Sequence, residues 1–129
     1  MTPRIPVSWG ELIDKITILE IKVERIADAS KVSNVRRELS ALQSAASEAG
    51  RIPAGGGNVM AELKAINAQL WDIEDHIREL DRNGDFGPRF VELARSVYRT
   101  NDRRAQLKRE ISLIMGSDLI EEKSYSEHD

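Results

Sequence analysis

The sequence predicts an all-helical fold, either an antiparallel four-helix bundle or long helical hairpins with left-handed packing like that of a coiled coil. In four separate stretches, apolar residues recur with alternating steps of three and four, which places them on one face of a helix. The same alternation favours shallow left-handed crossing angles. Aromatic residues make up only 5% of the 129 residues, and this composition favours helices over sheets. Short connections predict antiparallel neighbours within a single domain, residues 1–129.

The first helix is expected over residues 9–27. Ser8 and Glu11 have the spacing of a capping box, in which the side chain of each residue accepts a hydrogen bond from the backbone N–H of the other. Pro3 and Pro6 keep the preceding segment extended. The apolar stripe consists of Leu12, Ile16, Leu19, Val23 and Ile26.

The second helix is expected over residues 31–49, with Ser30 or Ser33 as its N-cap and Gly50 at its end. Its apolar stripe consists of Val32, Val35, Leu39, Leu42, Ala46 and Ala49. The Gly-rich stretch 50–57 follows. It lacks the Gly-Lys-Ser/Thr ending of a phosphate-binding loop, so we interpret it as a flexible connection.

The third helix is expected over residues 58–82 and the fourth over residues 88–115. Asn58 is a good N-cap for the third helix, and Gly116 closes the fourth. The apolar stripe of the third helix consists of Val59, Leu63, Ile66, Leu70, Ile73, Ile77 and Leu80. The fourth helix has Phe90, Leu93, Ala94, Val97, Ile111 and Met115 on its apolar face. The acidic tail 117–129 is expected to be loose, with Leu119 and Ile120 anchoring its start.

The composition excludes several classes of protein. There is no Cys, so the chain has no disulfide and no thiolate metal site. No run of 18 apolar residues is present, and no secretory signal pattern opens the chain, so we expect a cytoplasmic protein without a membrane span. A net charge of −3 and a pI near 5.5 argue against broad nucleic-acid binding.

The first helix carries a second apolar group, formed by Ile18 and Ile21, which point away from its main stripe. A helix that is apolar on nearly all sides is buried on nearly all sides. The interpretation that we favour is an oligomer interface, most simply a homodimer with two-fold symmetry. The alternative is that this helix lies at the centre of a monomer.

Polar residues lie on the apolar lines of three helices. On the fourth helix they are Asn101, Arg104 and Lys108. Candidate partners from the first and third helices are Glu20, Glu74 and Asn67. A buried cation without a partner is very costly, so we expect these groups to pair if they are buried.

The polar group has two interpretations. One is a structural network of ion pairs that fixes the register of the helices, or long side chains that reach out to solvent. The other is a binding pocket in which Arg104 and Lys108 hold an anionic ligand, Asn101 orients it, and Glu20 or Glu74 acts as acid or base.

A basic stripe, Arg95, Arg99 and Arg103, lies opposite the apolar face of the fourth helix. From residue 88 to residue 109 there are seven basic and two acidic residues. The stripe is either a solvated face, balanced by the acidic tail, or a docking surface for an acidic protein partner or a phosphate-bearing ligand. No aromatic residues interleave with it, which argues against nucleic acid.

No metal or cofactor is expected. Asp72 and His76 lie one turn apart and have metal-ligand spacing. A metal site needs a third or fourth ligand, and the only other histidine is His128 in the tail.

Several stretches together resemble an uncharacterised family of small bacterial helical proteins, a domain of unknown function. They are 6–22, 70–75, 101–104, 108–111 and 116–125. The resemblance implies a bacterial single-domain protein, found beside or fused to glycosyltransferases of surface-glycan assembly, and implies no activity. It directs attention to Glu20, Glu74, Asn101 and Arg104, which lie within the matching stretches.

A looser similarity is to the all-helical chorismate mutases, in which charged residues from several helices surround a dianionic substrate inside a dimer. The residue pattern over 12–26 is similar, but neither the N-terminal arginine of those enzymes nor their remaining substrate-binding positions can be placed on this chain. Two hypotheses therefore stand. The first is a helical interaction or accessory module of a bacterial, surface-glycan pathway. The second is a binding protein or enzyme for a small anionic metabolite held between helices.

Overall fold

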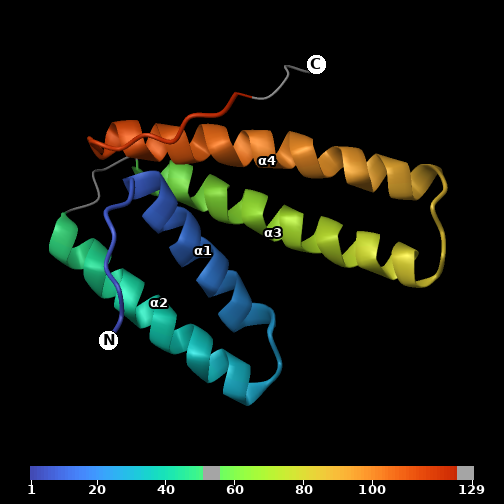
Figure 1. Cartoon of the computed structure of the whole chain (residues 1–129), viewed down its shortest axis with the longest axis horizontal. Coiled ribbons are helices and arrows are strands. Elements are labelled where there is room, and N and C mark those ends of the chain that lie inside the picture. The colour runs from blue at the N-terminus through green and yellow to red at the C-terminus, as the bar shows by residue number, and fades with distance from the viewer. Residues whose placement is uncertain (51–55, 125–129) are drawn as a thin grey trace.

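A computed structural model describes residues 1–50 and 56–124. This part of the chain contains four helices and no strand, so the all-helical prediction is confirmed. The helices are α1 (Trp9–Arg25), α2 (Ala29–Ala49), α3 (Gly56–Arg82) and α4 (Pro88–Ile114) (Figure 1). Most of the Gly-rich connection and the last five residues of the tail lie outside the described residues, so the expectations for them are not tested.

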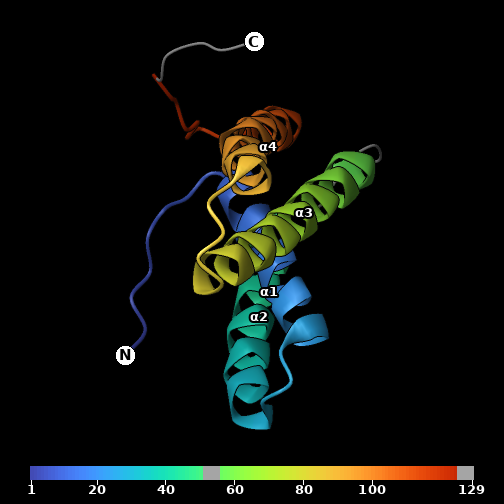
Figure 2. The ribbon, with the colours of Figure 1, turned by 90° about the vertical axis from the view of Figure 1, so that its right-hand side faces the viewer.

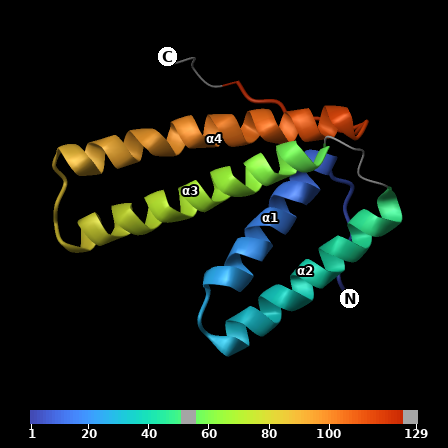
Figure 3. The ribbon, with the colours of Figure 1, turned by 180° about the vertical axis from the view of Figure 1, so that it is seen from behind.

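The helices form two hairpins, α1–α2 and α3–α4, which meet through α1. Helix α1 contacts each of the other three helices, whereas α2 contacts α1 alone. The most extensive contact joins α3 and α4, and this long hairpin extends well past the C-terminal end of α1 (Figures 1 and 3). The central position of α1 follows from its two apolar groups, since neighbours on several sides cover them.

Helix α1 begins with the expected cap. The Ser8 hydroxyl accepts a hydrogen bond from the Glu11 N–H at 3.1 Å. The helix ends at Arg25, two residues before the expected end, because Ile26 is already extended with φ −79° and ψ 128°. Helix α3 begins at Gly56, so Asn58 lies inside its first turn and is not the N-cap.

The cap of α2 differs from the prediction. The Asp28 carboxylate accepts from the N–H groups of Ser30 at 2.9 Å and Lys31 at 3.1 Å, so the helix starts at Ala29. Neither predicted serine is the cap, because an aspartate one residue earlier already satisfies the free N–H groups of the first turn.

Gly116 ends α4 as expected, in the left-handed conformation with φ +69°. The Gly116 N–H donates to the carbonyl of Leu113 at 3.2 Å, and the Ser117 N–H donates to that of Ser112 at 2.8 Å. These two bonds form a Schellman motif, which satisfies carbonyls that the helix leaves free and turns the chain back along α4.

The apolar core is small and lies where α1, α3 and α4 meet. Its centre consists of Ile13, Leu63, Leu107 and Ile111, each at most 4% exposed. No residue of α2 is buried, although its apolar stripe, apart from the exposed Ala49, is half-buried against α1. The three helices of the core therefore position the polar residues described next.

Candidate functional site

The centre of the polar group is an ion pair inside the bundle between Asp14 of α1 and Arg104 of α4. The Asp14 side chain is 1% exposed. Arg104 Nε donates to Oδ1 at 2.9 Å and Nη2 donates to Oδ2 at 2.6 Å. This two-pronged geometry is the strongest that a guanidinium and a carboxylate form.

Two further side chains complete the surroundings of Asp14. Asn67 Nδ2 of α3 donates to Asp14 Oδ1 at 3.0 Å and to Thr17 Oγ1 at 2.9 Å. The Thr17 hydroxyl donates in turn to the Asp14 carbonyl at 2.8 Å. Side chains from three helices thus meet at one carboxylate.

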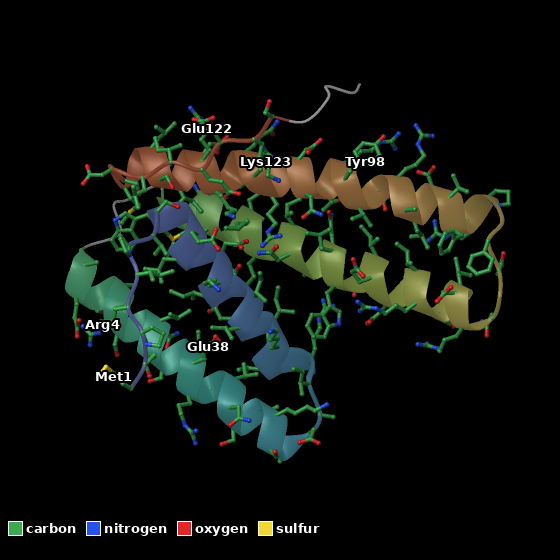
Figure 4. The ribbon with its side chains drawn as sticks, viewed as in Figure 1. Met1, Arg4, Glu38, Tyr98, Glu122 and Lys123 are labelled. Carbon is green, nitrogen blue, oxygen red and sulfur yellow. The ribbon has the colours of Figure 1, made fainter. Side chains whose placement is uncertain are left out.

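Lys108 extends the cluster towards the start of α1 and the tail. Its ammonium group lies 2.8 Å from Glu11 and 2.9 Å from Glu121, and its side chain is 12% exposed. The neighbouring Arg109 pairs with Glu122 at 2.6 Å. Residues 117–124 therefore lie along the outer side of α4, where Figure 4 labels Glu122 and Lys123.

The ion pairs hold these groups in their charged forms. Burial opposes ionisation of Asp14, but hydrogen bonds from Arg104 and Asn67 outweigh it and lower the pKa of the carboxyl. Burial also opposes the charge on Lys108, but the bonds with Glu11 and Glu121 raise the pKa of its ammonium group. Neither group is poised to exchange a proton near neutral pH, as an acid or base would need.

The start of α1 packs directly on the end of α4. The Gly10 N–H donates to the Ser112 hydroxyl, and the Trp9 N–H donates to the Ser117 hydroxyl, both at 2.9 Å. A Cβ atom at Gly10 would lie 2.1 Å from the Lys108 carbonyl oxygen, so only glycine permits this approach. Hydroxyl groups thus satisfy the first free N–H groups of α1.

The structure brings together four of the six predicted polar residues. Asn67, Arg104 and Lys108 belong to the cluster around Asp14, and the Asn101 side-chain oxygen accepts from Arg104 at 3.4 Å. The two glutamates lie elsewhere. Glu74 pairs with Arg78 of its own helix at 3.4 Å on the surface.

Glu20 points instead into a groove between α1, α2 and α3. The acidic partner that sequence reasoning missed is Asp14. Its signal is visible in the sequence, because Asp14, Thr17 and Ile21 lie three and four residues apart and so share one face of the helix.

Of the residues predicted for an oligomer interface and a basic stripe, some lie inside the chain and others at its surface. Ile21 is 2% exposed within the chain and packs inside it, while Ile18 is half-buried. In the basic stripe, Arg103 pairs with Glu62, Arg99 lies 5.8 Å from the ring centre of Tyr98, and Arg95 is exposed. The described part of the tail pairs with Lys108 and Arg109, beyond the stripe.

The groove has a volume of about 630 Å³. Its surface is mainly apolar, but the lining also contains the polar side chains Thr17, Glu20, Gln43, Ser47 and Lys64. The lining includes Ile13, Ile16, Glu20, Ala46, Met60 and Ala61. Because α2 and α3 do not contact each other, the groove is the space that they leave over α1.

The ionic cluster is complete in itself. No buried side-chain nitrogen or oxygen atom of the described residues lacks a hydrogen-bond partner. In the same part of the chain, no three potential metal ligands come together, and no helix is long and apolar enough to cross a membrane.

The fold and the cluster define a class of small helical protein in which charged side chains inside the molecule join two hairpins. The chain belongs to DUF6165, a family of unknown function, whose family model matches residues 3–128. The resemblance to an uncharacterised family is thereby confirmed. No curated protein and no solved structure matches the chain, so these comparisons indicate no specific function.

Proposed function

We propose that this chain is a helical interaction module and not an enzyme. The observation that carries the proposal is that Arg104 and Lys108, the residues best suited to clamp an anion, already have carboxylate partners within the chain. An anionic ligand would have to break a two-pronged ion pair and leave the buried Asp14 unpaired, which costs several kcal/mol.

The groove is the surface that supports a binding role. Its volume is typical of ligand and peptide sites, and its lining of apolar and small side chains suits an apolar segment of a partner. The resemblance to proteins found with glycosyltransferases of bacterial surface-glycan assembly supports a partner in such a pathway. A homodimer, expected from the sequence, is part of the same proposal.

A thermal-shift screen with phosphorylated sugars, nucleotide sugars and carboxylate metabolites tests the choice between module and enzyme. We expect no compound to raise the melting temperature of the protein in a way that depends on Arg104. Arg104→Lys is the test variant and Arg95→Lys, an exposed arginine on the same helix, is its matched control. A compound that stabilises the wild type and the control but not Arg104→Lys would establish the metabolite-binding alternative.

A further inference from the structure

The segment before α1 is an extended arm, residues 1–7, which carries apolar side chains into solvent. Ile5 is 75% exposed. Pro3 and Pro6 restrict the backbone to extended conformations. Arg4 is the one charged side chain of the arm, and it forms no ion pair with the described residues. In Figure 2 the arm stands clear of all four helices.

The groove offers the complementary features. Its lining is mostly apolar, and Glu20 lies in it half-buried. The nearby Lys64 donates its hydrogen bond to Glu24 at 2.7 Å and not to Glu20. Among the described residues Glu20 forms no hydrogen bond or ion pair, but its charge acts on Lys64, which also lines the groove. Because Lys64 pairs with Glu24, the two glutamates and one lysine leave an excess of one negative charge beside the groove.

We propose that the groove of one chain takes the arm of a second copy, with Ile5 against the apolar floor and Arg4 beside Glu20. The inference rests on the proposed function, because it names the partner that the groove receives. An apolar segment with one cation matches a groove of mainly apolar surface at which Glu20, Glu24 and Lys64 leave an excess of one negative charge. Two copies that exchange arms reciprocally form a closed dimer with two-fold symmetry.

The direction of the arm favours exchange over insertion into its own chain. In Figure 2 the arm leaves on the side opposite to the first turns of α3, which form one wall of the groove. Seven extended residues span about 23 Å, enough to reach across to a neighbouring molecule. The prolines reduce the conformational entropy that the arm loses when it is bound.

The chain exposes more surface than a compact monomer of its mass. The chain exposes 8900 Å², whereas a compact monomer of 14.5 kDa exposes about 6,900 Å². The exposed arm accounts for part of the excess of about 2,000 Å². A stable interface buries about 800 Å² on each partner, so exchange of the arms can supply the area that a dimer needs.

A reciprocal charge swap tests the pairing of the arm and the groove. We expect the wild type to be a dimer by light scattering, with a dissociation constant that rises about tenfold in Arg4→Glu and in Glu20→Arg. The double variant restores the attraction and should recover the wild-type value. Matched controls are Arg89→Glu and Glu79→Arg, which reverse exposed charges on α4 and α3.

A mixture of the two single variants gives a sharper result. In a heterodimer of Arg4→Glu with Glu20→Arg, each groove meets an arm of opposite charge. The mixture should therefore associate more tightly than either variant alone. Since the chain has no cysteine, chains with Ile5→Cys and chains with Ala61→Cys can also be mixed and oxidised, and a covalent dimer should form.

The outcomes separate this inference from the proposed function. A monomeric wild type overturns arm exchange. A dimer whose dissociation constant stays the same in Arg4→Glu, in Glu20→Arg and in their mixture overturns it too. A dimer without the cysteine cross-link overturns it as well. A monomeric wild type also removes the homodimer from the proposed function. It leaves the choice between interaction module and metabolite-binding protein open to the thermal-shift screen, in which an Arg104-dependent ligand overturns the module.

Discussion

Asp14 is the residue on which most of the internal polar contacts depend. It is 1% exposed and accepts hydrogen bonds from two other helices, so its charge is acceptable only with those partners in place. Paired charges inside a protein add little net stability, but removal of one partner is expensive, since the other is left desolvated and unpaired. We therefore expect the cluster to specify how the helices fit together more than it stabilises them.

Asp14→Asn should lower the free energy of unfolding by about 2–4 kcal/mol, because Arg104 loses its two-pronged partner. The expected loss in free energy is smaller than that for a fully buried pair, since the Arg104 side chain is 29% exposed. Chemical denaturation measures the loss. The control is Asp72→Asn, which removes an exposed ion pair with Arg25 and should cost less than about 1 kcal/mol. Equal losses in the two variants would contradict the central role of Asp14.

The depressed pKa of Asp14 also predicts how stability depends on pH. Because the folded-state pKa lies below the unfolded value near 3.9, the charged carboxylate stabilises the fold above that value. This contribution is lost as the pH falls through the folded-state pKa. Between about pH 5 and pH 2, the free energy of unfolding should fall less steeply with decreasing pH in Asp14→Asn than in the wild type. Parallel curves would mean that another carboxyl dominates acid unfolding.

Gly10 tests the close contact between α1 and α4. Gly10→Ala places a Cβ atom 2.1 Å from a backbone oxygen, which only a shift of a whole helix relieves. We expect a loss of about 3 kcal/mol in the free energy of unfolding. Gly57→Ala is the matched control, because a Cβ there meets nothing within 4 Å. It should be neutral or slightly stabilising, since alanine is the better helix former.

At the scale of helices, local sequence features predict where the helices lie, but they predict only part of the ionic cluster. Capping residues and apolar steps of three and four are read directly along the chain, and they locate four helices. Whether a carboxylate faces a neighbouring helix or solvent depends on where that neighbour lies. Glu20 lies near Lys64 of α3, but Lys64 pairs with Glu24 instead, and Glu74 pairs with Arg78 of its own helix. Asp14 lies opposite Arg104 because α1 crosses α4 at Gly10.

The start of α2 gives a test at this scale. Asp28→Ala removes the side chain that accepts from two N–H groups of the first turn, and it should cost about 1 kcal/mol. Ser30→Ala is the comparison, since Ser30 lies inside the helix and its side chain is exposed. It should leave stability within about 0.5 kcal/mol of the wild type. Thermal unfolding followed by circular dichroism measures both, and a larger loss at Ser30 would place the cap there.

At the scale of the whole molecule, the four helices are unequal in what holds them. Helices α1, α3 and α4 share the core and the ionic cluster, while α2 contacts α1 alone and buries none of its residues. A segment with few buried contacts opens at a lower free-energy cost than the global transition. We therefore expect α2 to be the first helix to open.

Hydrogen exchange followed by mass spectrometry measures this order. Amides in α2 should exchange faster than those in the α3–α4 segment where the core lies. Asp28→Ala should increase the exchange rate of the α2 amides and leave the rates in the other helices unchanged. Because α2 is also a wall of the groove, an arm bound there adds contacts that α2 lacks in the single chain. Exchange in α2 should then slow as protein concentration rises, and Glu20→Arg should remove this dependence. Uniform exchange across the four helices would mean that the molecule opens as one unit and that α2 is held by contacts beyond α1.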